Sequence, residues 1–253
     1  MLPMHQLHTT TVSEAQVAGE SLQSQRLPAL IQALFQPPPA GLIALLRGPD
    51  LVLSLATFAA GLYALKGHRV LLVDAGNSTD PYIVSRLAQA AGQDPRPVLA
   101  RVHVIRTFTV HQLAALAFNR LERFIRDRAP GLVILSGATS LFADANVPFK
   151  EGSWLLREIA AEVKRQAEAG CTVLVVAADP PLASGRTCLH LPWLDVASRS
   201  LRVDPSRTSG QAPSTSLPRA ESRGSGQALA FRYEKPRSCG IETVPMDHFL
   251  PFV

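Results

Sequence analysis

The chain has 253 residues, of which 47% are hydrophobic, and its formal net charge at pH 7 is +5. This length fits one large α/β domain, or one domain plus a small appendage, and the composition excludes a chain too polar to bury a core. The basic charge permits contact with nucleic acid but does not establish it. The three cysteines, Cys171, Cys188 and Cys239, form no Cys-x-x-Cys pair. Their spacing disfavours a zinc site and a disulfide framework, and it suggests a reducing compartment.

Neither a signal peptide nor a membrane span is expected. Residues 1–16 lack the basic start and apolar core that a signal peptide needs. Residues 51–65 are uncharged and apolar, but this stretch is shorter than the roughly 20 residues that cross a bilayer. The sequence therefore predicts a cytoplasmic protein without membrane contact.

Residues 41–73 alternate in a way that is typical of a nucleotide-binding α/β unit. They predict a strand over 41–46, a turn at 47–50, an apolar helix over 51–65 and a second strand over 69–73, which leads into Asp74. In a parallel sheet, the start of the helix that follows the first strand is where a nucleotide phosphate usually binds. Before this unit, residues 1–40 predict a polar segment and one short packing helix.

The following region continues the alternation of helices and strands. Asp80 is expected to cap a helix that has Pro81 in its first turn. This pattern predicts a doubly wound, mostly parallel sheet. The expected elements are a helix over 82–91, a strand over 98–105, a helix over 109–128, a strand over 132–135, a loop over 136–152, a helix over 154–169 and a strand over 171–177.

The last third of the chain changes in character. A short strand at 201–203 is followed by a segment rich in Ser, Pro, Gly and Arg, which cannot bury enough apolar surface to offset its ordering entropy. Two strands, at 228–234 and 240–244, then predict a short antiparallel hairpin at the sheet edge. The predicted organisation is an N-terminal segment (1–40), a core (41–203), a disordered insertion (204–227) and a C-terminal hairpin that completes the core sheet (228–253).

The phosphate-binding position does not carry phosphate-binding residues. A phosphate loop requires Gly-x-x-x-x-Gly-Lys-Ser/Thr, whereas this chain has GPDLVLSL, which begins with Gly48, Pro49 and Asp50. No lysine occurs from Gly48 through Leu65, and Ser54 is the only nearby hydroxyl. The bulky side chains at 51–53 are expected to fill the space that a phosphate would need.

Several motifs occur in the order typical of one ATPase superfamily. The relevant pieces are VD at 73–74, GQDP at 92–95, RTF at 106–108, HQL at 111–113, LVILSG at 132–137, TVLVVAADPP at 172–181 and FRYEKPRSCGIETVPM at 231–246. This order resembles the RecA/Rad51 superfamily of P-loop ATPases, in particular its RadA/KaiC-like branch. The resemblance covers residues 41–177 and the C-terminal hairpin, and it implies a RecA-like core.

The resemblance also shows which functional groups are missing. The catalytic carboxylate of the family aligns near Gly76, and the Walker B aspartate falls at Ser136. Together with the missing lysine, these departures imply a pseudo-ATPase that uses no cofactor or metal, because polyphosphate charge would be poorly compensated. Asp74 is expected to cap the turn that follows it.

Two loops correspond to the places where recombinases contact DNA. The loop after Gly137 contains Phe149 and Lys150, and the loop after Ala178 contains Arg186. An aromatic side chain beside a cation can bind single-stranded nucleic acid. The sequence therefore predicts an inactive accessory factor in DNA recombination or repair, which binds DNA, a recombinase or another protein, alone or in a homo- or hetero-oligomer.

Two other hypotheses remain open. The chain could be a non-enzymatic scaffold or regulatory subunit of an active protein, similar to the SulA/ImuA-like relatives of RecA, which also lack the phosphate loop. It could instead bind a nucleotide or small ligand with unorthodox groups around Asp74, Asn77 and Ser78.

Overall fold

The structure is a computed structural model, and it describes residues 41–180, 185–186, 188–207, 227–235 and 241–245. The packing helix expected within residues 1–40 lies outside these ranges, as does most of the insertion expected at 204–227.

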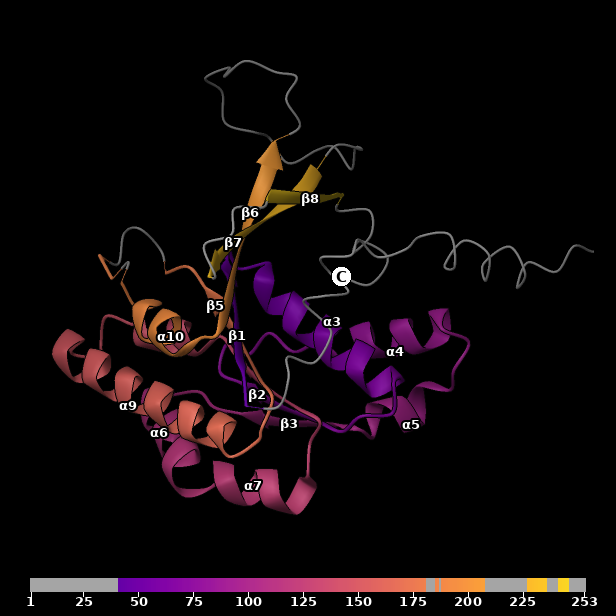
Figure 1. Cartoon of the computed structure of the whole chain (residues 1–253), viewed down its shortest axis with the longest axis horizontal. Coiled ribbons are helices and arrows are strands. Elements are labelled where there is room, and N and C mark those ends of the chain that lie inside the picture. The colour runs from indigo at the N-terminus through magenta and orange to yellow at the C-terminus, as the bar shows by residue number, and fades with distance from the viewer. Residues whose placement is uncertain (1–40, 181–184, 187, 208–226, 236–240, 246–253) are drawn as a thin grey trace, which may run out of the picture.

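The described strands form one sheet of eight in the order β3-β2-β4-β5-β1-β6-β7-β8 (Figure 1). The six strands from β3 to β6 are parallel, whereas β7 and β8 run antiparallel to their neighbours. This α/β architecture is consistent with the RecA-like doubly wound fold that the sequence predicts. The strands are β1 (Ile43–Gly48), β2 (Val70–Asp74), β3 (Val102–Arg106), β4 (Leu132–Ser136), β5 (Val173–Ala178), β6 (Arg199–Arg207), β7 (Gln227–Lys235) and β8 (Ile241–Pro245).

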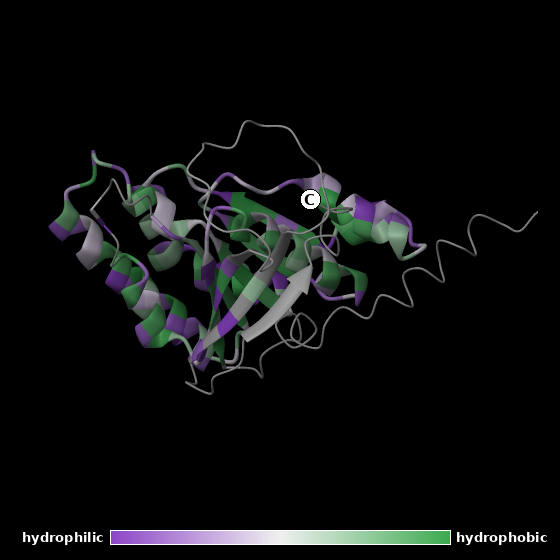
Figure 2. Cartoon of the chain, turned by 90° about the horizontal axis from the view of Figure 1, so that it is seen from above, coloured by the Kyte–Doolittle hydropathy of each residue, from purple (hydrophilic) through white to green (hydrophobic). Residues whose placement is uncertain are grey.

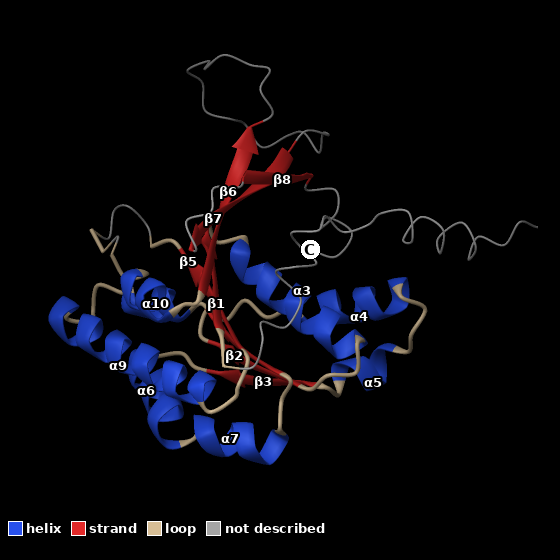
Figure 3. Cartoon of the chain, in the orientation of Figure 1, coloured by secondary structure: helices blue, strands red, loops and turns tan. Residues whose placement is uncertain are grey.

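Helices cover both faces of the parallel part of the sheet (Figure 3). Helices α3, α4 and α5 lie on one face, and α6, α7, α9 and α10 lie on the other. Helix α8 packs on the second face, against α9 and β5. The helices are α3 (Val52–Leu65), α4 (Pro81–Ala90), α5 (Pro95–Leu99), α6 (Val110–Asn119), α7 (Leu121–Arg128), α8 (Ala138–Phe142), α9 (Phe149–Glu168) and α10 (Leu191–Val196).

The central strands are buried on both faces. Every residue of β2, β4 and β5 is buried, as expected for continuous apolar runs in a parallel sheet. Successive side chains point to opposite faces, so Leu72 packs in the cluster under α3 whereas Val73 packs in the cluster under α6 and α9. Figure 2 shows hydrophobic residues gathered in the centre of the molecule and alternating hydrophobic and hydrophilic residues along the helices around it.

Helix α3 is apolar because most of its length is buried between the sheet and α4. Phe58, Ala59 and Ala60 are at most 1% exposed. Gly61 lets α4 approach closely, because a Cβ atom at this position would lie 2.6 Å from Leu87 Cδ1. The apolar run at 51–65 is therefore explained by burial within the protein.

The cap predicted for α4 is confirmed. Asp80 accepts a hydrogen bond from the backbone N–H of Tyr82 at 2.9 Å, and Pro81 is the first helical residue. The same Asp-Pro cap starts α5, a helix that the sequence analysis missed. Asp94 accepts from the N–H of Arg96 at 3.0 Å and begins α5, so the expected strand over 98–105 is wrong at its start and β3 begins only at 102.

Other boundaries also differ from the predictions. The helix expected over 109–128 is broken at Arg120, whose backbone is non-helical (φ −131°), into α6 and α7. The loop expected over 136–152 contains α8 and the start of α9, so Phe149 and Lys150 are helical. Strand β6 continues to Arg207, past the boundary expected at 203. Helix α10 was not expected.

Candidate functional site

Residues that the sequence assigns to a degenerate nucleotide site lie at the carboxyl edge of the parallel strands. Gly48 ends β1, Asp74 ends β2 and Ser136 ends β4. Asp74 is directly paired with Ser136 in the sheet register. The structure therefore brings these three positions to one edge of the sheet, because parallel strands have their carboxyl ends on the same side.

The first turn of α3 is closed upon itself. The N–H groups of Val52, Leu53 and Ser54 donate to the carbonyls of Pro49, Asp50 and Leu51 at 2.9, 3.0 and 3.2 Å. A helix start binds phosphate through N–H groups that have no partner within the helix. These three donors are already engaged, and the exposed side chain of Asp50 adds a negative charge beside them. The turn therefore fits neither a polyphosphate nor its magnesium ion.

Gly48 has a packing role in place of a phosphate-binding role. A Cβ atom at this position would lie 2.4 Å from the carbonyl oxygen of Val203 on the neighbouring strand β6. The amide of Asp179 also donates to the Gly48 carbonyl at 2.6 Å. Only glycine lets the end of β1 lie this close to β6. Gly48 matches the first glycine of a phosphate loop, and this packing contact explains why a glycine stands there.

Asp74 stabilises the loop that follows it. Its side chain is completely buried, and its two oxygens accept hydrogen bonds from the N–H groups of Ser78 and Thr79, each at 3.1 Å. The guanidinium of Arg106 lies 3.5 Å from one of these oxygens and also donates to the Thr79 carbonyl. Because both oxygens are engaged, the carboxylate has the capping role that the sequence predicts.

The position expected for a catalytic carboxylate, Gly76, lies close to the backbone of Gly137 and the side chain of Leu53. A Cβ atom at Gly76 would lie 3.2 Å from Gly137 Cα and 3.3 Å from Leu53 Cδ1. The reverse contact is closer, because a Cβ atom at Gly137 would lie 2.4 Å from the backbone of Gly76. A side chain at Gly76 would therefore require Leu53 or the backbone of Gly137 to shift by a few tenths of an ångström.

Ser136 is buried at the end of β4. It is 1% exposed, and its Oγ has no hydrogen-bond partner within the described ranges; the same holds for the hydroxyls of Ser78 and Thr107. Nor do the described residues contain a group of three or more His, Cys, Asp or Glu that could hold a metal ion. Ser54, on the first turn of α3, is only half-buried.

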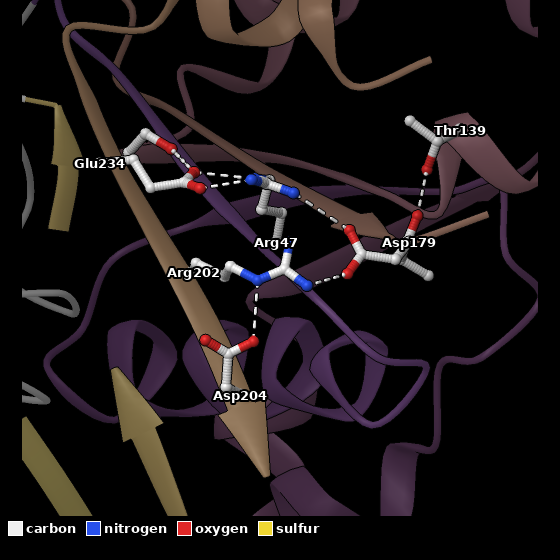
Figure 4. Close-up of polar contacts among 8 residues, drawn as sticks. Arg47, Thr139, Asp179, Arg202, Asp204 and Glu234 are labelled. Carbon is white, nitrogen blue, oxygen red and sulfur yellow. Dashed lines mark hydrogen bonds and ion pairs between the residues drawn. The ribbon is translucent and has the colours of Figure 1, made fainter. Parts of the chain in front are cut away.

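An ion network that the sequence analysis missed lies beside this edge (Figure 4). Arg47 of β1 contacts both carboxylate oxygens of Glu234 on β7, with its Nε 2.7 Å from Oε2. It also contacts Asp179 at 3.3 Å. Bidentate arginine–carboxylate pairs are among the strongest hydrogen-bonded contacts in proteins. Arg47 therefore connects β1, the first strand of the core, to β7.

The network continues along β6. Arg202 donates to Asp179 and to Asp204, both at 2.8 Å, and Arg232 lies 3.3 Å from Asp204. With Arg47 and Glu234, this set contains three arginines and three carboxylates, so its formal charges cancel. The strand register places Arg47 beside Arg202 and Arg202 beside Arg232. Because this pairing depends on strands that are far apart in the sequence, no local sequence pattern predicts it.

The three residues expected to contact DNA have different roles. Arg186 donates to the carbonyls of Phe142, Asp144 and Val147 at 2.7–2.8 Å, so it holds the connection between α8 and α9 in place. Phe149 and Lys150 line a groove of about 460 Å³ between α9 and the chain around α10, which we call the α9–α10 groove. Its lining includes Phe149, Lys150, Leu156, Arg157, Cys188 and Asp195.

No model of a known protein family matches this sequence, and none of the curated proteins matches it. Within the described ranges, no helix combines the length and the apolar character needed to cross a membrane.

Proposed function

We propose that this chain is a catalytically inactive RecA-like protein that acts through binding, as an accessory factor in DNA recombination or repair. The motif order at 69–177 and the doubly wound sheet support the RecA-like part of the proposal. The assignment to recombination or repair rests on the resemblance alone.

The observation that carries the proposal is the closed first turn of α3. Its N–H groups are bonded to the carbonyls of residues 49–51, and Leu53 packs against Gly76, where an active relative would need open space. A nucleotide phosphate that bound here would have to break these hydrogen bonds. It would gain no contact with a lysine from residues 48–65, and the carboxylate of Asp74 is already engaged, so it is not free to hold a metal ion that would neutralise the phosphate charge. Binding therefore costs more here than the available contacts could offset.

A thermal-shift experiment tests this proposal most directly. A ligand that binds only the native state at 100 times its dissociation constant stabilises it by about 2.7 kcal/mol, which raises the melting temperature. We expect no such rise with millimolar ATP or ADP, with or without Mg²⁺, and no phosphate release above the buffer rate. An active RecA-like ATPase in the same plate supplies the positive control. A rise in melting temperature that saturates with nucleotide would favour the unorthodox ligand binder instead.

A specific observation favours protein contacts over DNA contacts within this proposal. Arg186 donates hydrogen bonds to three backbone carbonyls, and among the described residues that line the α9–α10 groove Phe149 is the only aromatic one. This supports the scaffold hypothesis, in which a partner protein is the main ligand. Fluorescence anisotropy with single-stranded DNA at low salt, alongside co-purification of partners from the native host, separates the two roles. DNA affinity without a protein partner would contradict the scaffold.

A further inference from the structure

The α9–α10 groove has apolar side chains on its floor and on both rims. Leu156 of α9 and Leu189 are buried in its floor, whereas Phe149 and Leu191 on opposite rims are 46% and 48% exposed. Exposed aromatic and leucine side chains around a concavity are typical of binding surfaces. The volume of about 460 Å³ lies at the small end of ligand-pocket sizes, so it accommodates a few side chains and not a whole domain surface.

Two cations line the α9 wall of this groove. Lys150 and Arg157 are exposed, and within the described ranges neither forms an ion pair. They are seven residues apart on one helix, which places them on the same face about 10 Å apart along its axis. The opposite wall carries the carboxylate of Asp195. The groove therefore offers positive charge along one wall, negative charge on the other and apolar surface between them.

We infer that the α9–α10 groove binds a short peptide segment of a partner protein, with an apolar anchor residue and an acidic residue directed at Lys150 and Arg157. This inference rests on the proposed function, because it assigns a surface to the protein contacts proposed there. The acidic residue complements Lys150 and Arg157, which form no ion pair with the residues that the structure describes, and the anchor covers Leu156 and the apolar rims.

The charge pattern disfavours nucleic acid as the occupant. Asp195 faces the groove, and the exposed carboxylates of Glu151 and Glu158 each follow one of the two cations on α9. A polyanion that follows the groove would meet the carboxylate of Asp195, and Glu151 and Glu158, which lie on α9 outside the groove lining, add negative charge nearby. A peptide can place one carboxylate between the cations and keep the remaining surface neutral or basic. The single aromatic side chain also offers little stacking surface for bases.

The test begins with a random twelve-residue peptide library displayed on phage and selected against the full chain. We expect the enriched peptides to combine a large apolar residue with Asp or Glu. A fluorescein-labelled consensus peptide should then lose at least about tenfold in affinity when Lys150→Ala and Arg157→Ala are combined. Lys164→Ala is the matched control, because Lys164 lies on the same helix outside the groove lining, and this variant should bind as the wild type does.

Cys188 gives a second readout that does not depend on substitutions in the groove. Its thiol is exposed on the groove wall, whereas Cys171 is buried and burial raises its pKa to about 11, so Cys171 should not compete for alkylation. In a Cys239→Ser background, the bound peptide should slow alkylation of Cys188 severalfold.

Three results would overturn the inference. The library could give no enrichment over an unrelated protein, or the consensus peptide could bind the double variant as tightly as the wild type. In the third case, labelled oligothymidine would bind the wild type and lose affinity in the double variant, which would assign the groove to nucleic acid. A nucleotide-dependent rise in melting temperature, by contrast, would contradict the pseudo-ATPase proposal and leave the peptide result intact.

Discussion

At the residue scale, the close contact between the loops after β2 and β4 depends on glycines, because a larger side chain would not fit between the two backbones. Gly137 has φ +74°, in the left-handed region, and any side chain there would meet the backbone of Gly76 at 2.4 Å. Gly137→Ala should therefore lower the free energy of unfolding by about 2 kcal/mol or more, through strain and collision with a backbone that cannot move aside. Gly67→Ala is the control, because Gly67 has φ +91° but open space around it, and it should cost only about 1 kcal/mol. Urea denaturation measures both, and equal losses would contradict the contact between the loops.

Asp74 allows a second prediction about a single residue. Asp74→Ala removes the acceptor for the N–H groups of Ser78 and Thr79 and the partner of Arg106. Buried donors without a partner are costly, so we expect a loss of about 2–4 kcal/mol in the free energy of unfolding. Asp50→Ala, at an exposed position on the same edge, should change stability by less than about 0.5 kcal/mol. If the Asp74 variant kept its stability, the carboxylate would be reserved for a ligand and not for the fold.

The sequence predicts the roles of residues whose partners lie nearby in the chain. It does not predict roles that depend on partners far away in the chain. Asp80 before Pro81 is a local capping signal, and the same signal at Asp94 is sufficient to find α5. The role of Arg186 depends on carbonyls that lie 39–44 residues earlier in the chain, and no sequence pattern reveals them. The capping role of Asp74 was predicted, whereas its pairing with Arg106 depends on the register of β2 and β3.

At the element scale, the strands were easier to predict than the short helices. Continuous apolar runs such as LVILS and VLVVAA are buried on both faces of a parallel sheet, so composition alone identifies β4 and β5. Helices α5 and α8 have five residues each and α10 has six. Such lengths do not complete two turns, so they leave no periodic pattern, and packing against the sheet rather than propensity forms them.

The junction of β1, β6 and β7 should depend on pH. Burial alone would raise the pKa of Glu234, but the hydrogen bond and charge of Arg47, with Ser200 and Arg202, outweigh it and lower the pKa below the ordinary value of 4.5. A lowered native pKa means that this contribution to stability is fully present above pH 4.5 and is lost as the pH falls through the native value. Urea denaturation between pH 7 and pH 3 should show this loss.

The variant Glu234→Gln isolates that contribution. It keeps the size of the side chain but removes the charge that pairs with Arg47, so it should be less stable than the wild type at pH 7, and the difference should shrink toward pH 3. Glu158→Gln is the control, because Glu158 is exposed and outside the network, and it should follow the wild-type profile. A Glu234 variant whose deficit stayed constant with pH would show that the ion network does not stabilise this junction.

At the scale of the whole molecule, the two hydrophobic layers share one set of strands. Adjacent residues of β2 and β4 point into opposite layers, so neither layer can lose its packing without exposing strands that the other requires. The sequence predicted this architecture because alternating strands and helices allow few topologies. It could not predict how β1 is connected to β7, since that connection depends on ion pairs between residues 187 positions apart.

This shared sheet predicts one cooperative unfolding transition. The two tryptophans differ in exposure, since Trp193, a residue of α10, is completely buried and Trp154, on α9, is 59% exposed. In a Trp154→Phe variant, fluorescence therefore reports on Trp193 alone, and its emission should shift to longer wavelength when urea unfolds the chain. Because α10 packs on the same sheet as α3, we expect this transition to coincide with the loss of helical circular dichroism. The dichroism midpoint of the wild type controls for the substitution. A fluorescence transition at lower urea would mean that the α9–α10 layer unfolds separately, and that the groove between these helices can open without disrupting the sheet.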